Sequence, residues 1–165
     1  MSKIESQYIS GTPTREQVND LISHYQNGTL IAAEKLAGVL TREFPSNNLT
    51  WKVLGEVLSA TGRKSEALEA NQTAIMIAPH DAAAHVNLGI TLSELERLDE
   101  AEASYSQAIK LKSDFPEAYN NLSTTLKELG RLEDADAGFR QAIALTLTVP
   151  KPMSTWPICL KDWEG

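Results

Sequence analysis

The chain has 165 residues, which suits one domain with a sizeable buried core. Its formal net charge of -7 and its scattered basic side chains argue against non-specific nucleic-acid binding, which needs clustered lysines and arginines. The single cysteine, Cys159, allows no intrachain disulfide. The N-terminus lacks the apolar core of a signal peptide, and no window reaches the roughly 18 apolar residues of a membrane span, so we expect a cytoplasmic protein.

The N-terminal part of the chain predicts a flexible arm followed by a helix hairpin. Residues 1–11 are polar and lack periodicity, as is typical of a loosely held arm. Thr12-Pro13-Thr14 is a helix start, because proline is tolerated in a first turn and threonine can cap it. Residues 14–47 then fit a hairpin of two helices. The first helix of this hairpin is displaced by about one residue from the repeat pattern of the later hairpins.

The rest of the chain up to residue 147 repeats itself. Segments beginning at residues 51, 85 and 119 are 34 residues apart and align without gaps. Leucines recur in two columns of the first helix, and small residues recur where two helices would cross closely. The leucine columns are Leu54, Leu88 and Leu122, then Leu58, Leu92 and Leu126; the small columns are Gly55, Gly89 and Ser123, then Ala67, Ala101 and Ala135, then Ala74, Ala108 and Ala142. A single hairpin would leave its apolar face in water, so the copies are expected to stack.

These columns resemble the tetratricopeptide repeat. The matching residues of the first clear copy are Trp51, Leu54, Gly55, Leu58, Ala67, Ala74 and Pro79. Asn71 departs from the pattern by replacing an aromatic residue. The resemblance implies an all-α, right-handed superhelix of about four hairpins, at residues 14–47, 48–81, 82–115 and 116–147. The chain is similar to bacterial arrays found with O-GlcNAc-transferase-like and sulfotransferase domains.

The turns and the residues after them carry two further predictions. Gly28, Gly62 and Gly130 lie between paired helices, where a left-handed residue ends a helix at low cost. Glu96 takes this place in the third hairpin, which predicts a different turn geometry there. The arginines that follow three of these turns are expected to pair with nearby carboxylates and not to form a basic stripe: Arg63 with Glu66, Arg97 with Glu100, and Arg131 with Asp134.

The resemblance implies that the first helices line a concave groove that holds a peptide or partner segment. The candidate groove residues are Lys52, Glu56, Val86, Asn87, Ile90, Asn120, Asn121, Thr124 and Lys127. Asn87 and Asn121 are 34 residues apart, so their amides could grip an extended backbone, as in the asparagine ladder of O-GlcNAc transferases; the alternative is that asparagine is merely tolerated on a solvated face. Lys52 and Lys127 would favour some acidity in the segment. Only two of five positions match the clamp with which chaperone-binding arrays hold a terminal carboxylate, so that ligand is not expected.

The pattern stops after Leu145, and residues 148–165 form a tail of different character. Prolines 150, 152 and 157 exclude a regular helix, while the tail is rich in apolar side chains. These are Trp156, Ile158, Leu160 and Trp163. The tail can cover the open face of the last hairpin, enter the groove of a second molecule to give a homodimer, or lead to a further domain in a longer chain.

No catalytic motif is visible. The three histidines have no partner at metal-ligand spacing, Cys159 has no nearby histidine, and there is no glycine-rich phosphate loop. We therefore expect no enzyme, no cofactor and no metal site. The favoured function is a protein-interaction scaffold. The alternatives are an accessory subunit that presents substrate to a glycosyl-, sulfo- or methyltransferase, and a self-assembling structural protein.

Overall fold

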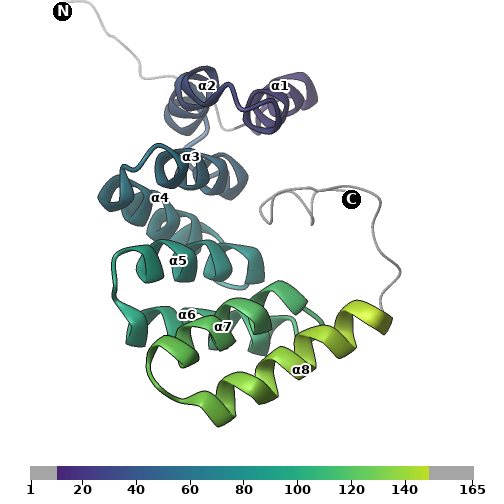
Figure 1. The fold of residues 1–165 in the computed structure, drawn as a ribbon. Coiled ribbons are helices and arrows are strands. Elements are labelled where there is room, and N and C mark those ends of the chain that lie inside the picture. The colour runs from purple at the N-terminus through teal and green to yellow at the C-terminus, as the bar shows by residue number, and fades with distance from the viewer. Residues whose placement is uncertain (1–10, 149–165) are drawn as a thin grey trace, which may run out of the picture.

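The structure is a computed structural model that describes residues 11–148. Within that range it contains eight α-helices and no strand, which confirms the all-α prediction (Figure 1). The helices are α1 Arg15–Gln26, α2 Leu30–Glu43, α3 Asn48–Ala60, α4 Lys64–Ile77, α5 Ala82–Glu94, α6 Leu98–Leu111, α7 Pro116–Glu128 and α8 Leu132–Thr148. Almost all of the predicted arm, and the tail after Thr148, lie outside these residues.

Consecutive helices pair as antiparallel hairpins, and the hairpins stack. Each odd-numbered helix packs on the even-numbered helix that follows it, and each even-numbered helix packs on the first helix of the next hairpin. Successive first helices also touch, α1 with α3, α3 with α5 and α5 with α7. The result is the predicted superhelix, in which the chain winds from α1 to α8 without any segment crossing back (Figure 1).

Small residues hold the two helices of each hairpin close together. Ala67, Ala74, Ala101 and Ala108 are fully buried. A Cβ atom added at Gly89 would lie 2.5 Å from Cε1 of Tyr105, so only glycine lets α5 approach that ring. The column of small residues found in the sequence is therefore a packing requirement.

Asn71 is a polar residue at a position where the repeat pattern has an aromatic one, and hydrogen bonds hold its buried side chain. Its side chain is 1% exposed, and its Nδ2 donates to Oγ1 of Thr91 (2.9 Å) and to the backbone carbonyl of Asn87 (3.3 Å). The amide lies against Gly55, where a Cβ would be 2.3 Å from Oδ1. Hydrogen bonds from Nδ2 to α5 thus replace the ring contacts that Tyr105 makes in the next repeat, while Oδ1 of Asn71 has no hydrogen-bond partner among the described residues.

The residues at the start of two successive repeat copies, Trp51 and His85, anchor the loops that join hairpins. Nε1 of Trp51 donates to the carbonyl oxygen of Pro45 at 3.0 Å, and Nε2 of His85 lies 3.0 Å from the carbonyl oxygen of Pro79. His85 thus shares the structural position of Trp51, as the repeat alignment indicates.

All four turns within hairpins use a left-handed residue. Gly28, Gly62 and Gly130 have φ angles of 71°, 80° and 79° as predicted, and Glu96 has a φ of 60°. The prediction of another geometry at Glu96 was wrong. The amides of Glu96 and Arg97 bond the carbonyls of Ser93 and Leu92 at 2.9 Å, the same pattern as at Gly62, so helix-end hydrogen bonding overrides the preference of glutamate.

Replacing Glu96 with glycine is expected to stabilise the protein by roughly 0.5–1 kcal/mol, because the left-handed penalty exceeds the extra entropy of glycine in the unfolded chain. Gly62→Ala should change the free energy of unfolding in the opposite direction. Thermal unfolding followed by circular dichroism measures both. A Glu96→Gly variant that melts below the parent protein would contradict the strain argument.

Candidate functional site

The polar residues expected to line the groove on α3 and α5 instead make contacts that join these two helices. Lys52 is 4% exposed, and its Nζ lies 2.7 Å from Oδ2 of Asp81. Asp81 also accepts from Nδ2 of Asn48 (2.7 Å) and caps α5 by accepting from the amides of Ala83 (2.9 Å) and Ala84 (3.2 Å). Lys52 thus joins α3 to the start of α5, and this charge is already neutralised.

Asn87 is likewise part of the junction between these helices. It is 3% exposed, and its Nδ2 donates to Oε1 of Glu56 at 2.9 Å. One turn further on, the hydroxyl of Ser59 donates to Glu94. Val86 is fully buried. Lys52, Val86 and Asn87 therefore offer a partner almost no surface.

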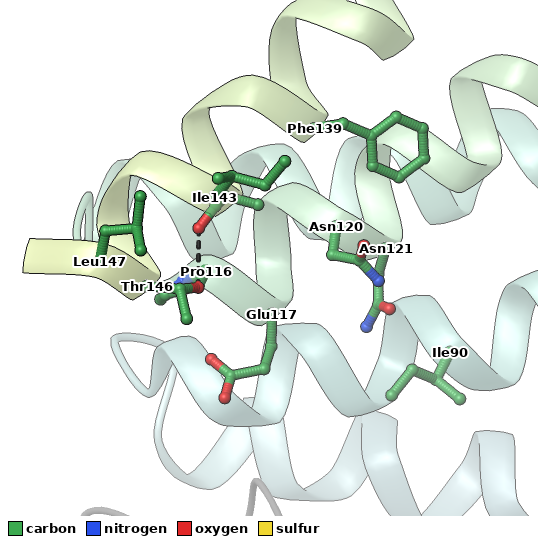
Figure 2. A pocket seen from close by; sticks show the side chains of 10 residues that line it. Ile90, Pro116, Glu117, Asn120, Asn121, Phe139, Ile143, Thr146 and Leu147 are labelled. Atoms are coloured by element: carbon green, nitrogen blue, oxygen red, sulfur yellow. Dashed lines mark hydrogen bonds between the residues drawn. The ribbon is translucent and has the colours of Figure 1, made fainter. Parts of the chain in front are cut away.

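An open groove lies instead at the last hairpin, between α7 and α8 (Figure 2). Its volume is about 750 Å³. We call it the terminal groove; its lining residues are Ile90, Pro116, Glu117, Asn120, Asn121, Phe139, Ala142, Ile143, Thr146 and Leu147.

The sequence predicted some of the residues that line this groove on α5 and α7, but none of those on α8. Ile90, Asn120 and Asn121 were candidate residues and line it, whereas Thr124 and Lys127 are exposed on α7 but do not. Neither the wall formed by α8 nor the start of α7 was among the candidates. The available signal was the repeat itself, since each lining residue has an equivalent 34 positions earlier.

Those equivalents explain why the groove exists. The residues that correspond to Asn120, Asn121, Phe139 and Ala142 in the preceding hairpin are buried. They are Val86 (0% exposed), Asn87 (3%), Tyr105 (2%) and Ala108 (0%). They belong to the part of the stack against which α7 packs. The terminal groove therefore lies beside α8 at the position that α7 has beside α6.

The chemistry of the groove combines an apolar wall with two amides. Ile143 and Leu147 on α8 are 61% and 82% exposed, although both are large hydrophobic residues. Across from α8, Asn120 and Asn121 project from α7 towards the side of Ile90 (Figure 2). No residue between 11 and 148 hydrogen-bonds to these two side-chain amides. Each can donate two hydrogen bonds and accept others, so they suit the backbone of a bound segment.

The charge at this site does not favour an acidic ligand. The only ionisable side chain in the lining is Glu117, a carboxylate. Thr146, the one hydroxyl in the lining, donates to the carbonyl oxygen of Ala142 at 2.8 Å. The lysines expected to attract an acidic segment do not line the groove, so the lining offers an acidic segment no cationic partner.

The arginine column forms no basic stripe either. Arg97 donates to Glu100 (2.6 Å) and Arg131 to Asp134 (2.8 Å), and Arg63 pairs with Glu66, as predicted. Hydrogen bonds from Arg63 and Arg97 hold the pKa values of Glu66 and Glu100 below the usual carboxyl value. These exposed pairs contribute little, and what they contribute is present above the ordinary carboxyl pKa and lost as the pH falls through the lowered values.

Residues 11–148 contain neither a candidate membrane-spanning helix nor a candidate metal site. No helix there is long and apolar enough to span a membrane. No group of three or more histidine, cysteine, aspartate or glutamate side chains in the described part of the chain could hold a metal ion.

Comparison with known proteins identifies repeats of a known family. A family model described as "TPR repeat" matches residues 91–130, and a second, "Tetratricopeptide repeat", matches residues 117–149. These matches identify residues 91–149 as tetratricopeptide repeats. No curated protein matches the chain.

Solved structures of tetratricopeptide repeat proteins share the fold. MamA from Desulfovibrio magneticus RS-1 is 18% identical, with a TM-score of 0.73 over 82% of this chain and 76% of that one. TTC0263, a thermophilic TPR protein from Thermus thermophilus, is 25% identical, with a TM-score of 0.71 over 78% and 71%. YrrB, described as a TPR protein with an unusual peptide-binding site, is 20% identical, with a TM-score of 0.69 over 80% and 68%. The narrower likeness to transferase-linked arrays has no support among these structures and stays a prediction.

Proposed function

We propose that this tetratricopeptide repeat protein is an interaction scaffold that receives an apolar segment of a partner in the terminal groove. The observation that carries the proposal is the contrast between repeats. Val86, Asn87 and Tyr105 are buried in the third hairpin, whereas their equivalents in the fourth are not, and Ile143 is 61% exposed where Ile109 is half-buried; the equivalents are Asn120, Asn121 and Phe139. Burying large aliphatic side chains against a ligand is favourable by about 25 cal/mol per Å² of apolar surface.

The family supports a binding role, since stacked repeats present extended surfaces to other proteins. YrrB, which shares the fold, is described as having a peptide-binding site. In this chain the amides of Asn120 and Asn121 would bond the backbone of the segment, while the α8 wall takes its apolar side chains. Specificity then resides in the spacing of those side chains.

The test uses a displayed library of random peptides, selected on the immobilised full-length protein. Peptides that bind the groove should lose at least about tenfold in affinity with Ile143→Asp, because a carboxylate would be buried in an apolar contact. Leu132→Asp is the matched control: Leu132 is on the same helix and 58% exposed, but it does not line the groove.

Two results would count against this function. One is the absence of any enriched peptide; the other is an equal loss of binding in the Ile143→Asp and Leu132→Asp variants. The Asn120→Ala/Asn121→Ala variant then tests the amides, with an expected loss of about fivefold for each hydrogen bond removed.

A further inference from the structure

Helix α8 ends beside the terminal groove. Each earlier junction between hairpins is short: residues 44–47, 78–81 and 112–115 connect one hairpin to the first helix of the next. That first helix then packs on the second helix of the preceding hairpin. Residues 149–165 follow α8 at the equivalent point of the last repeat, and Thr146 and Leu147, which precede them, already line the groove.

The composition of this segment matches the groove. It contains Trp156, Ile158, Leu160 and Trp163, while prolines 150, 152 and 157 prevent it from forming the regular helix that would continue the array. Trp156 is eight residues beyond Thr148, a span of at most about 29 Å. The α8 wall from Phe139 to Leu147 is only about 12 Å long, so the segment can reach all of it.

Helix α1, which head-to-tail stacking would place on α8 of another molecule, offers no comparable apolar face; the exposed Ile31 and Val39 lie on α2. On α1 the exposed side chains include Arg15, Glu16, Asn19 and Asp20. Head-to-tail stacking of two molecules would therefore place charged groups against Ile143 and Leu147. A segment of the same chain is the better occupant, because its apolar residues are tethered next to the groove.

We propose that residues 149–165 occupy the terminal groove of their own molecule, with Trp156 or Trp163 against the α8 wall, and compete there with the partner segment. This inference rests on the proposed function, since both require a groove that accepts a chain segment. A short tether gives an effective concentration of about 1 mM, so an intrinsic dissociation constant near 100 µM fills the groove about nine tenths of the time. A partner then binds about tenfold more weakly than it would to an empty groove.

Cys159 is the only cysteine of the chain, and it lies within this segment, so disulfide trapping tests the proposal in the full-length protein. In an Asn120→Cys variant, mild oxidation should join Cys159 to the groove within one molecule. Arg140→Cys is the control: residue 140 is exposed on α8 and closer in sequence to Cys159, but outside the groove. We expect the intramolecular disulfide to form at least ten times faster in the Asn120→Cys variant.

Equal rates in the two variants would overturn the proposal, and so would disulfides formed only between molecules, which would place the segment in a second copy. A second measurement separates this inference from the proposed function. The Trp156→Ser/Trp163→Ser variant should bind a selected peptide about tenfold more tightly than the parent protein does.

If the disulfide forms selectively but no peptide binds the groove, the inference holds and the proposed function fails. If peptides bind the groove, equal disulfide rates or unchanged affinity in the tryptophan variant leave the function standing and refute the inference.

Discussion

Replacing Asp81 with alanine is expected to destabilise the protein by about 3–5 kcal/mol. The substitution leaves the ammonium group of Lys52, which is 4% exposed, without its carboxylate partner at 2.7 Å. It also removes the cap of α5, which contributes about 1 kcal/mol in typical helices. Because the pair joins α3 to the start of α5, the stack should separate into two halves at this junction. Urea unfolding followed by circular dichroism measures the loss.

Two companion variants separate the charge from the cap. Asp81→Asn keeps an oxygen that can accept from the helix amides but still leaves Lys52 unpaired. Lys52→Met/Asp81→Asn removes both charges and should recover most of the lost stability, since an apolar side chain tolerates this site better than an unpaired ammonium. A loss below about 1 kcal/mol for Asp81→Ala, or a double variant no more stable than Asp81→Asn, would refute this account of the junction.

Gly89→Ala should destabilise the protein by about 2 kcal/mol, because it forces two helices apart at a fully packed crossing. The new Cβ would lie 2.5 Å from Cε1 and 2.8 Å from Cδ1 of Tyr105, a ring that is 2% exposed. Gly38→Ala is the matched control, since Gly38 is also inside a helix and a Cβ there meets no atom within 4 Å. That variant should gain up to about 1 kcal/mol from helix propensity.

The ionisation of Tyr105 gives Gly89→Ala a second readout. Burial raises the pKa of Tyr105 to about 12, so the neutral phenol stabilises the fold below pH 10, and this contribution is lost as the pH rises through 12. A ring displaced by the alanine methyl should titrate closer to its ordinary pKa. Equal melting temperatures for the Gly89→Ala and Gly38→Ala variants, with an unchanged tyrosine titration, would contradict the packing argument.

The fold was predictable because residues 34 positions apart take equivalent places in the packing of successive hairpins. Buried columns such as Leu58, Leu92 and Leu126 recur wherever two helices meet, and one hairpin implies its neighbours. Glu96 was misjudged because residue preference was weighed without the hydrogen bonds that close the helix end, which are the same as at Gly62. The backbone preference of a single residue is overridden when the hydrogen bonds of the hairpin already determine the turn geometry.

The site was less predictable, for two physical reasons. A sequence shows which polar residues face a groove but not whether they find partners across it. Lys52 was assigned to a ligand, yet it pairs with Asp81 at the start of the next helix. Second, a repeat pattern does not show how exposed each copy of a column is. Ile143 fits its column like Ile109 before it, and only the structure shows that it lies 61% exposed.

The central claim, that the terminal groove is where this protein binds a chain segment, is tested most directly by isoleucine methyl NMR of the full-length protein during titration with a selected peptide. Ile90 and Ile143 line the groove, whereas Ile31 is 74% exposed on α2, far along the stack. The account predicts saturable shifts of the Ile90 and Ile143 methyl signals while that of Ile31 stays in place. Shifts confined to Ile31 and other residues outside the groove, with Ile90 and Ile143 unmoved, would contradict it.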